Sequence, residues 1–372
     1  MKVKELWSFK HYEPILGVKL GDINDDGQVE VVAYTETGRL LILSLKGELL
    51  YQEIISKNSP IWHLEIYDID KDGTNELILG GMDGYLRIFK CNKTYVLDSL
   101  WNHKLGSSIS GILLDDLNLD NKNEVIVFSL DKTIRILKNL EGNLVWGQVF
   151  EDGIGDAIVY TDHRNPGKKE IIACGNDGSF RVFDAITGKL LWFEKYSDKI
   201  RCITYLNSIN GPVIICGGDD KKLHIIDKEA QEEIKTIEFN DYIWKCISYP
   251  FLKLNKVIIN SYSFAHFNSS IPLENIKFTS KLICLNETLE VIWELKGFNV
   301  EFLDIIEIYE KIFLLAGTTR GEVLIIEERT GKILNKINKD SCTNMIQFFV
   351  EKGLIFSCHE NGRIFAYKIE NL

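Results

Sequence analysis

The chain has 372 residues, of which 45% are hydrophobic and 26% charged, as in ordinary globular proteins of one or two domains. Its 54 acidic residues outnumber the 43 basic ones, and the net charge of −11 disfavours phosphate backbones and anionic lipid surfaces as partners. The longest apolar runs, such as residues 213–216, are too short to cross a bilayer. We therefore expect neither nucleic-acid binding nor membrane insertion.

The N-terminal segment and the cysteines indicate a compartment. No apolar stretch or small-residue cleavage site follows the first lysines, which predicts a cytoplasmic protein. The eight cysteines include no C-x-x-C pair, and most lie inside apolar runs. This pattern predicts buried, reduced thiols rather than disulfides or a zinc site.

A repeated unit runs through the chain, with starts near residues 15, 61, 109, 154, 200, 243, 300 and 342. Each unit contains a short apolar strand, a polar turn, a strongly apolar strand, a tight turn and an alternating strand. A fourth strand follows in seven of the units. Four strands with a period of about 45 residues are typical of a β-propeller blade. One four-stranded sheet cannot bury both faces alone, whereas blades arranged in a ring bury them against their neighbours.

The two ends of the chain indicate how the ring closes. The last unit stops after its third strand, and the chain begins with an extra strand, residues 4–12, whose ELWSF resembles the fourth strands NLVWGQ and KLLWFE. We therefore predict an all-β, single-domain propeller over residues 1–372, with eight four-stranded blades and residues 4–12 completing the last one. Seven blades are the alternative if the irregular sixth unit is mis-assigned, and a sandwich of hairpins is another.

Aromatic residues recur in the predicted fourth strands. They are Trp7, Tyr51, Trp101, Trp146, Trp192 and Trp293. A large flat ring at one place in each blade suits packing between blades. We interpret these side chains as structural and not as a platform for substrate.

An acidic loop follows the first strand in the first three blades. Its residues are Asp22, Asn24, Asp26 and Glu30 in blade one, Asp68, Asp70, Asp72 and Glu76 in blade two, and Asp116, Asn118, Asp120 and Glu124 in blade three. A glycine follows the third acidic position in the first two loops, and Asn121 replaces it in the third. Blade four has only a remnant, with Asp162 and Glu170.

These loops suit a hard cation such as Ca²⁺. Side chains at the first, third and fifth loop positions converge on one point, and glycine at the sixth permits a sharp turn. The loop is not an EF-hand, because Leu79 stands where the twelfth-position glutamate would be in blade two. The alternatives are a Mg²⁺ site or a metal-free turn in which Asp and Asn bond their own backbone.

The sixth unit contains an insertion, residues 261–279, between its second and third strands. Insertions on one face of a repeat array often carry binding. We predict a partner-docking loop with contacts from Tyr262, Phe264, His266 and Phe267, on the face opposite the acidic loops. The alternative is a lid that packs its own aromatic residues over the central channel.

Two resemblances follow from these motifs. Residues 184–192, DAITGKLLW, resemble the D-x-x-T-G-K-x-x-W docking motif of PQQ-like, quinoprotein-type propellers. The acidic loops of blades one to three resemble FG-GAP and VCBS-type repeats, which have the pattern D-x-[DN]-x-D-G-x-x-[DE] between the first and second strands. The resemblances imply an eight-bladed propeller with structural Ca²⁺ in the first three blades.

The sequence favours a non-catalytic scaffold that binds a protein partner, with structural Ca²⁺ as the one cofactor considered. A PQQ-like enzyme is one alternative, but the chain has no adjacent cysteine pair and no C-x-x-C-H haem motif. A calcium-dependent adhesion or sensor module is another and would need export. A further alternative, the outer-membrane assembly lipoprotein type of propeller, is disfavoured because there is no lipobox.

Overall fold

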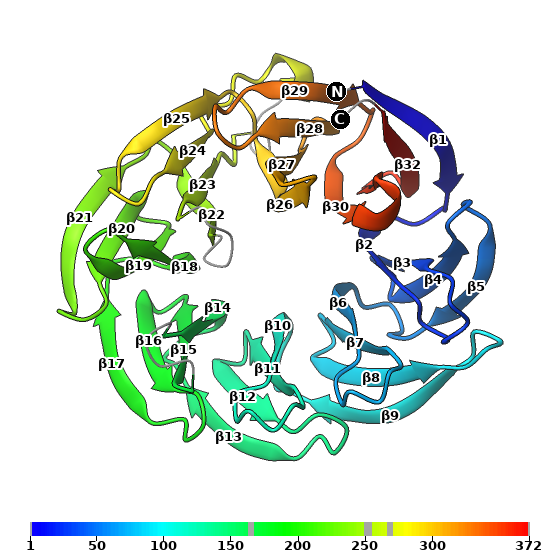
Figure 1. The fold of residues 1–372 in the computed structure, drawn as a ribbon, viewed down its shortest axis with the longest axis horizontal. Coiled ribbons are helices and arrows are strands. Elements are labelled where there is room, and N and C mark those ends of the chain that lie inside the picture. The colour runs from blue at the N-terminus through cyan, green and yellow to red at the C-terminus, as the bar shows by residue number, and fades with distance from the viewer. Residues whose placement is uncertain (1, 163–166, 249–254, 266–270, 371–372) are drawn as a thin grey trace.

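The computed structural model describes residues 2–162, 167–248, 255–265 and 271–370. Within them, eight four-stranded sheets stand around a central axis, and Figure 1 shows the ring they form. Every neighbouring pair of strands is antiparallel, as in the β2–β3 and β3–β4 pairs of blade one. This arrangement confirms the predicted eight-bladed propeller and excludes both the seven-bladed ring and the sandwich.

The inner half of each blade consists of its first two strands. The innermost strands are β2 (Ile15–Gly21), β6 (Ile61–Tyr67), β10 (Ile109–Asp115), β14 (Ile154–Thr161), β18 (Ile200–Ser208), β22 (Tyr242–Ser248), β26 (Val300–Ile308) and β30 (Thr343–Phe349). The second strands are β3 (Glu30–Thr35), β7 (Glu76–Gly81), β11 (Glu124–Ser129), β15 (Lys169–Gly175), β19 (Gly211–Gly218), β23 (Val257–Tyr262), β27 (Lys311–Thr318) and β31 (Leu354–His359).

The outer half of each blade has two further strands. The third strands are β4 (Arg39–Ser44), β8 (Tyr85–Cys91), β12 (Thr133–Leu137), β16 (Ser179–Asp184), β20 (Lys222–Asp227), β24 (Lys281–Leu285), β28 (Glu322–Glu327) and β32 (Arg363–Glu370). The outermost strands are β5 (Leu49–Ile54), β9 (Leu97–Lys104), β13 (Leu144–Val149), β17 (Leu190–Lys195), β21 (Glu232–Glu238), β25 (Val291–Lys296), β29 (Ile333–Asn338) and β1 (Lys2–Lys10). The described residues also form two short 3₁₀ turns, η1 (Leu273–Asn275) and η2 (Val350–Lys352).

The N-terminal strand closes the ring. Strand β1 pairs antiparallel with β32, from Lys2 opposite Glu370 to Lys10 opposite Arg363, and so becomes the outermost strand of blade eight. The labels N and C lie side by side in Figure 1. The predicted closure is therefore confirmed, and the two ends of the chain lie in one sheet, that of blade eight.

The core lies between blades. All six residues of β3 and all six of β7 are buried, because these second strands are covered on both faces by neighbouring blades. Between blades one and two, for example, Val32 and Tyr34 pack with Ile61 and Leu77. A strand buried on both faces needs apolar side chains on both, which explains why the second strands have continuous apolar runs rather than alternating ones.

Four of the predicted fourth-strand tryptophans dock onto the next blade. The indole N–H of Trp146 in blade three donates to the carbonyl of Ala185 in blade four, at 2.9 Å. The ring covers Gly188, where a Cβ atom would lie 2.5 Å from it and where φ is +68°. Glycine is required there by both the contact and the backbone. Trp7, Trp101 and Trp293 make the same bond to Leu45, Asn139 and Glu328.

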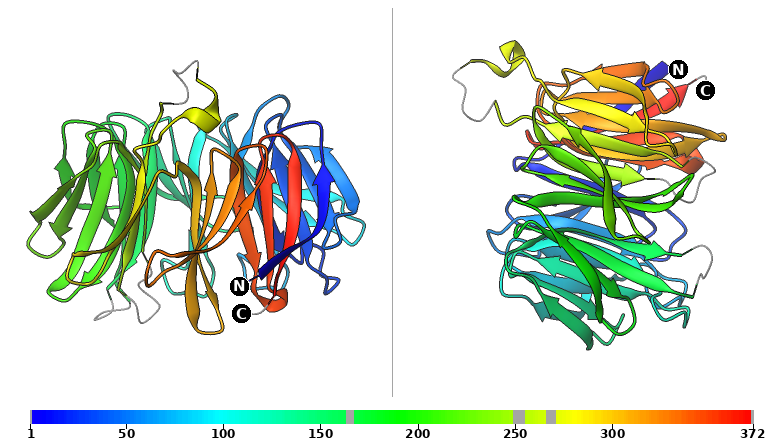
Figure 2. Two further views of the ribbon diagram at one scale, coloured as in Figure 1. Left: turned by 90° about the horizontal axis from the view of Figure 1, so that it is seen from above. Right: turned by 90° about the vertical axis from the view of Figure 1, so that its left-hand side faces the viewer.

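The strand order assigns the loops to two faces. In each blade the connection from the first to the second strand and that from the third to the fourth emerge on one face, called here the acidic face. The other connections emerge on the opposite face. There, η1 protrudes from the ring, at the top of the left view of Figure 2.

Candidate metal centre in the acidic loops

The three acidic loops share one pattern of backbone hydrogen bonds. In blade two, the Asp68 carboxylate accepts the N–H groups of Asp72 and Gly73 at 3.1 and 2.9 Å, and Asp72 accepts that of Thr74 at 2.8 Å. Blades one and three repeat these bonds from Asp22, Asp26, Asp116 and Asp120. Each loop is therefore an Asx-type turn closed by its first carboxylate.

A glutamate at the start of the second strand closes each loop from inside. Each accepts one backbone N–H, Glu30 from Ile23 at 3.2 Å, Glu76 from Ile69 at 3.1 Å and Glu124 from Leu117 at 2.9 Å. Burial raises the pKa of Glu30 and of Glu76 to about 7 and also raises the pKa of Glu124. A raised pKa means that the charged form lacks compensation, which a cation would supply.

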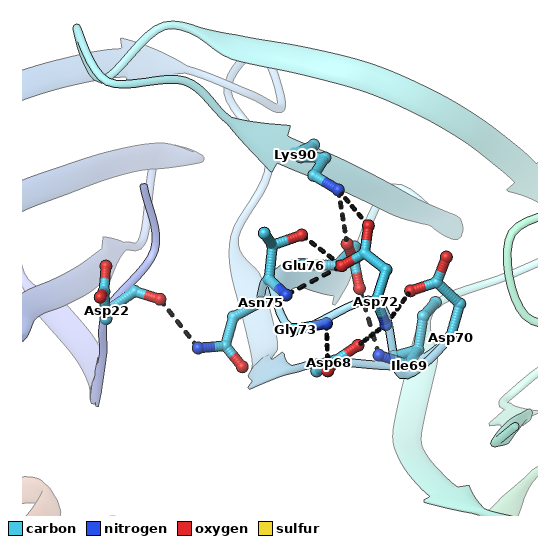
Figure 3. Close-up of polar contacts among 10 residues, drawn as sticks. Asp22, Asp68, Ile69, Asp70, Asp72, Gly73, Asn75, Glu76 and Lys90 are labelled. Atoms are coloured by element: carbon cyan, nitrogen blue, oxygen red, sulfur yellow. Dashed lines mark hydrogen bonds and ion pairs between the residues drawn. The ribbon is translucent and has the colours of Figure 1, made fainter. Parts of the chain in front are cut away.

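Blade two brings three predicted ligands together. One oxygen each of Asp68, Asp70 and Glu76 lies within 4.8 Å of the other two, and Figure 3 shows these side chains around the loop. Glu76 is fully buried, and its Oε1 atom has no hydrogen-bond partner among the described residues. A buried oxygen without a donor is costly unless something else satisfies it. Three carboxylate oxygens form the hard donor set that Ca²⁺ and Mg²⁺ prefer.

The fourth predicted ligand of blade two points to a lysine instead. Asp72 lies 2.7 Å from the ammonium of Lys90, which also lies 3.8 Å from Glu76. The hydrogen bond from Lys90 lowers the pKa of Asp72 to about 2 and raises the pKa of Lys90. Sequence reasoning missed Lys90, although it stands directly opposite Glu76 in the β7–β8 pair. The side-chain ammonium of Lys90 therefore places a positive charge at the edge of the candidate centre.

Blades one and three fit a cation less completely. In blade one, Oδ1 of buried Asn24 has no hydrogen-bond partner among the described residues, so this loop offers one unpaired neutral oxygen. In blade three, the amide of Asn118 already donates to Glu124 at 3.0 Å and to Asp120 at 3.2 Å. Blade two is therefore the strongest candidate and blade three the weakest.

The loops are joined into a belt across blades one to four. The side chain of Asn75 in blade two donates to the carbonyl of Asp22 in blade one at 2.8 Å. The backbone N–H of Asn123 in blade three donates to Ile69 in blade two, and Lys169 in blade four donates to Asp116 in blade three. Anything that stiffens one loop will therefore act on its neighbours.

The predicted partner-docking residues are only partly described. Tyr262 is buried, stacks on Trp244 at 5.0 Å and donates to Glu301. Phe264 is half-buried and packs edge-on against Trp244 at 5.6 Å. His266 and Phe267 lie outside the described residues. Tyr262 thus offers little surface to a partner, whereas Phe264 and Trp244 offer more.

A pocket of about 430 Å³ lies on the channel side of blades three to six. Its lining comes from the innermost strands β10, β14, β18 and β22 and includes Asp156, Thr204, Lys245 and Cys246. Burial raises the pKa of Asp156 to about 6 and lowers the pKa of Lys245. Lys245 donates to the carbonyl of Leu303 at 3.0 Å.

None of the helices in the described ranges is long and apolar enough to span a membrane.

The fold and the loops together define an eight-bladed β-propeller, and comparison with known proteins supports that class. A family model for the λ-carrageenase β-propeller domain matches residues 137–249. No curated protein matches the chain.

Three solved structures resemble the chain over nearly its full length. The computationally designed Ika8 protein covers 98% of this chain and 99% of its own, with a TM-score of 0.73 and 16% identity. Sqt1 of Saccharomyces cerevisiae covers 100% of both chains, with a TM-score of 0.75 and 10% identity. BamB from Moraxella catarrhalis covers 99% of this chain and 100% of its own, with a TM-score of 0.66 and 15% identity. At these identities the likeness concerns the fold alone.

Proposed function

We propose that the protein is a non-catalytic interaction scaffold whose acidic face binds Ca²⁺, first of all in the loop of blade two. The observation that carries this proposal is Glu76 Oε1, a fully buried oxygen that receives no hydrogen bond from the part of the chain that the structure describes. It lies beside converging oxygens of Asp68 and Asp70. A carboxylate in that state is stabilised by a divalent cation more than by anything else nearby, since Lys90 remains 3.8 Å away.

The ion would supply charge neutralisation and fix the loop, and no reaction step depends on it. Asp68 already closes the turn through Gly73, so the loop is preorganised before metal arrives. The bond from Asn75 to Asp22 transmits the rigidity to blade one. A stiff acidic face presents a constant surface to a partner, and the net charge of −11 favours a partner whose contact surface is basic.

Titration of the purified protein with Ca²⁺ and Mg²⁺, followed by calorimetry and thermal melting, tests the metal part. We expect a saturable heat and a rise in melting temperature with Ca²⁺, and a weaker response to Mg²⁺, which demands a tighter octahedral site. The absence of any heat or shift with millimolar Ca²⁺ would leave the loops as metal-free turns.

The scaffold part is tested by affinity purification from the native host with and without a chelator. We expect a partner that is retained by the wild-type chain and lost after chelation or on substitution of Glu76→Gln. A matched variant lacking residues 263–277 examines the opposite face. Loss of the partner in that variant alone would show that the partner binds the insertion and not the acidic face.

A further inference from the structure

Two cysteines from neighbouring blades meet at the channel side of the ring. Cys202 lies on β18 in blade five and Cys246 on β22 in blade six, and their Sγ atoms are 3.0 Å apart. Both side chains are nearly inaccessible, at 1% and 5% exposure. The sequence predicted buried, reduced thiols, and it gave no reason to pair these two. The signal was nevertheless present, because the two residues are separated by 44 positions, about one repeat.

The geometry suits a covalent link. A disulfide has an S–S distance near 2.05 Å, so the two sulfur atoms need to approach by about 1 Å. Strands β18 and β22 pack against each other in one hydrophobic cluster that contains both cysteines, together with Leu206 and Ile243. Inner strands of a propeller have a free edge toward the channel, which leaves them room for so small an adjustment.

One of the two cysteines is among the residues that line the channel-side pocket. Cys246 is one of the residues that line the pocket of about 430 Å³, together with Thr204 and Lys245, and Cys202 is not among them. A small reagent that enters the pocket therefore meets Cys246 first. Cys202 is then in place as the second thiol, because its sulfur already contacts that of Cys246.

We propose that Cys202 and Cys246 form a thiol–disulfide exchange site that accepts a small, neutral disulfide from the central channel. The Cys246 thiol loses its proton to solvent and attacks one sulfur of the reagent RSSR, which gives a mixed disulfide and releases RS⁻. Cys202 then loses its proton and attacks Cys246 Sγ, which releases the second RS⁻ and leaves an inter-blade disulfide. In balance, two protein thiols and RSSR give one protein disulfide and two RSH, so the protein is oxidised and the reagent reduced.

The surroundings set the speed of this exchange. Burial raises the pKa of Cys246, and the neighbouring Cys202 adds to that increase. Because the thiolate is the attacking species, exchange will be slow at neutral pH. The product closes a loop of 44 residues between blades five and six, which stabilises the folded ring by restricting the unfolded chain.

The experiment uses the full-length, reduced protein and 2-hydroxyethyl disulfide as the probe. After incubation and removal of the probe, the chain is unfolded in N-ethylmaleimide and digested with trypsin without reduction. We expect the number of reactive thiols to fall by two from the eight of the reduced chain. We also expect a cross-linked pair of peptides, residues 202–221 with 246–253. Because Cys216 shares the first peptide, Cys216→Ser is the matched control and must retain the cross-link.

Two further variants establish the order of the steps. Cys202→Ser should lose the cross-link and retain the probe's half as a mixed disulfide on Cys246. Cys246→Ser should lose both the cross-link and the adduct. The wild-type mapping is decisive by itself if a variant fails to fold. Eight reactive thiols after prolonged incubation, or a cross-link that persists in Cys202→Ser, would overturn the proposal.

Discussion

Glu76 in blade two and Glu170 in blade four occupy the same place in their blades, each paired with a tyrosine near the end of the innermost strand. Their surroundings differ. Glu170 lies 2.6 Å from Lys228 of blade five, and both side chains are almost buried. Glu76 has its cation, Lys90, at 3.8 Å, and the ammonium is engaged by Asp72.

The difference shows two solutions to one electrostatic problem. A buried carboxylate at the start of a second strand needs a positive partner. In blade four the positive partner of the buried glutamate is a lysine of the next blade, Lys228. A metal ion is therefore not required to neutralise Glu170. Blade two has the acidic loop residues and a lysine 3.8 Å from Glu76, and there we propose a divalent cation as the second partner.

Removal of the lysine from blade four should have the largest effect. Lys228→Met removes the closer and more buried of the two lysines at Glu170, because Lys168 lies 3.4 Å away and is half exposed. We expect the free energy of unfolding to fall by about 3 kcal/mol. Urea denaturation measures the change. The double variant Lys228→Met, Glu170→Gln should recover most of it, and a loss below about 1 kcal/mol in the single variant would show that the pair is not the neutralising contact.

The next effect is the response to calcium. At a Ca²⁺ concentration about 100 times the dissociation constant, the wild-type protein should gain about 2.7 kcal/mol of unfolding free energy. Glu76→Gln should lose that gain, because a neutral amide replaces the central carboxylate. The matched substitution Glu170→Gln, made together with Lys228→Met, should retain it. An equal response in both variants would remove the contrast between the two blades.

A smaller effect concerns pH in metal-free buffer. The pKa of Glu76 is about 7 in the folded state and about 4.5 as a free side chain. A raised folded pKa favours the folded state at low pH, and this contribution is lost as the pH rises from about 4.5 through 7. Melting temperatures across that range should fall less steeply in Glu76→Gln. Glu30, whose pKa is also about 7, preserves part of the slope. If the melting temperature of Glu76→Gln depended on pH as steeply as that of the wild type, the raised pKa of Glu76 would be contradicted.

Substitution of Lys90 should have the smallest effect on stability. Lys90 is about one-third exposed, at 37%, so Lys90→Met should cost less than about 1 kcal/mol. Its removal frees Asp72 and takes a competing positive charge away from Glu76. We expect calorimetry to show a severalfold tighter Ca²⁺ affinity. A weaker affinity would mean that Lys90 supports the site rather than competes with it.

Much of the fold could be predicted because its signals are local and repeated. The eight units, the continuous apolar runs of second strands such as residues 30–35, and the closing strand near Trp7 all follow from periodicity and pattern. The docking of Trp146 onto Gly188 was predicted only as packing between blades, since sequence does not show which blade a side chain touches.

The sequence predicted the carboxylates of the candidate centre but not the lysines that lie beside them. Spacing brought Asp68, Asp70 and Glu76 together, because alternate residues of a tight loop converge. Lys90 and Lys228 decide which carboxylate is neutralised, and they come from a facing strand and from the next blade. Their placement depends on register and on blade packing, which a single sequence does not show. The contact between Cys202 and Cys246 was missed for the same reason.

The most direct test of the central claim is a crystal structure of the protein grown with Ca²⁺. We predict an ion in the loop of blade two, about 2.3 to 2.6 Å from oxygens of Asp68, Asp70 and Glu76. We also predict no ion at the blade-four position, where Glu170 keeps its contacts with Lys228 and Lys168. A blade-two loop that contains only the ammonium of Lys90 and water at saturating Ca²⁺ would contradict the proposed metal site.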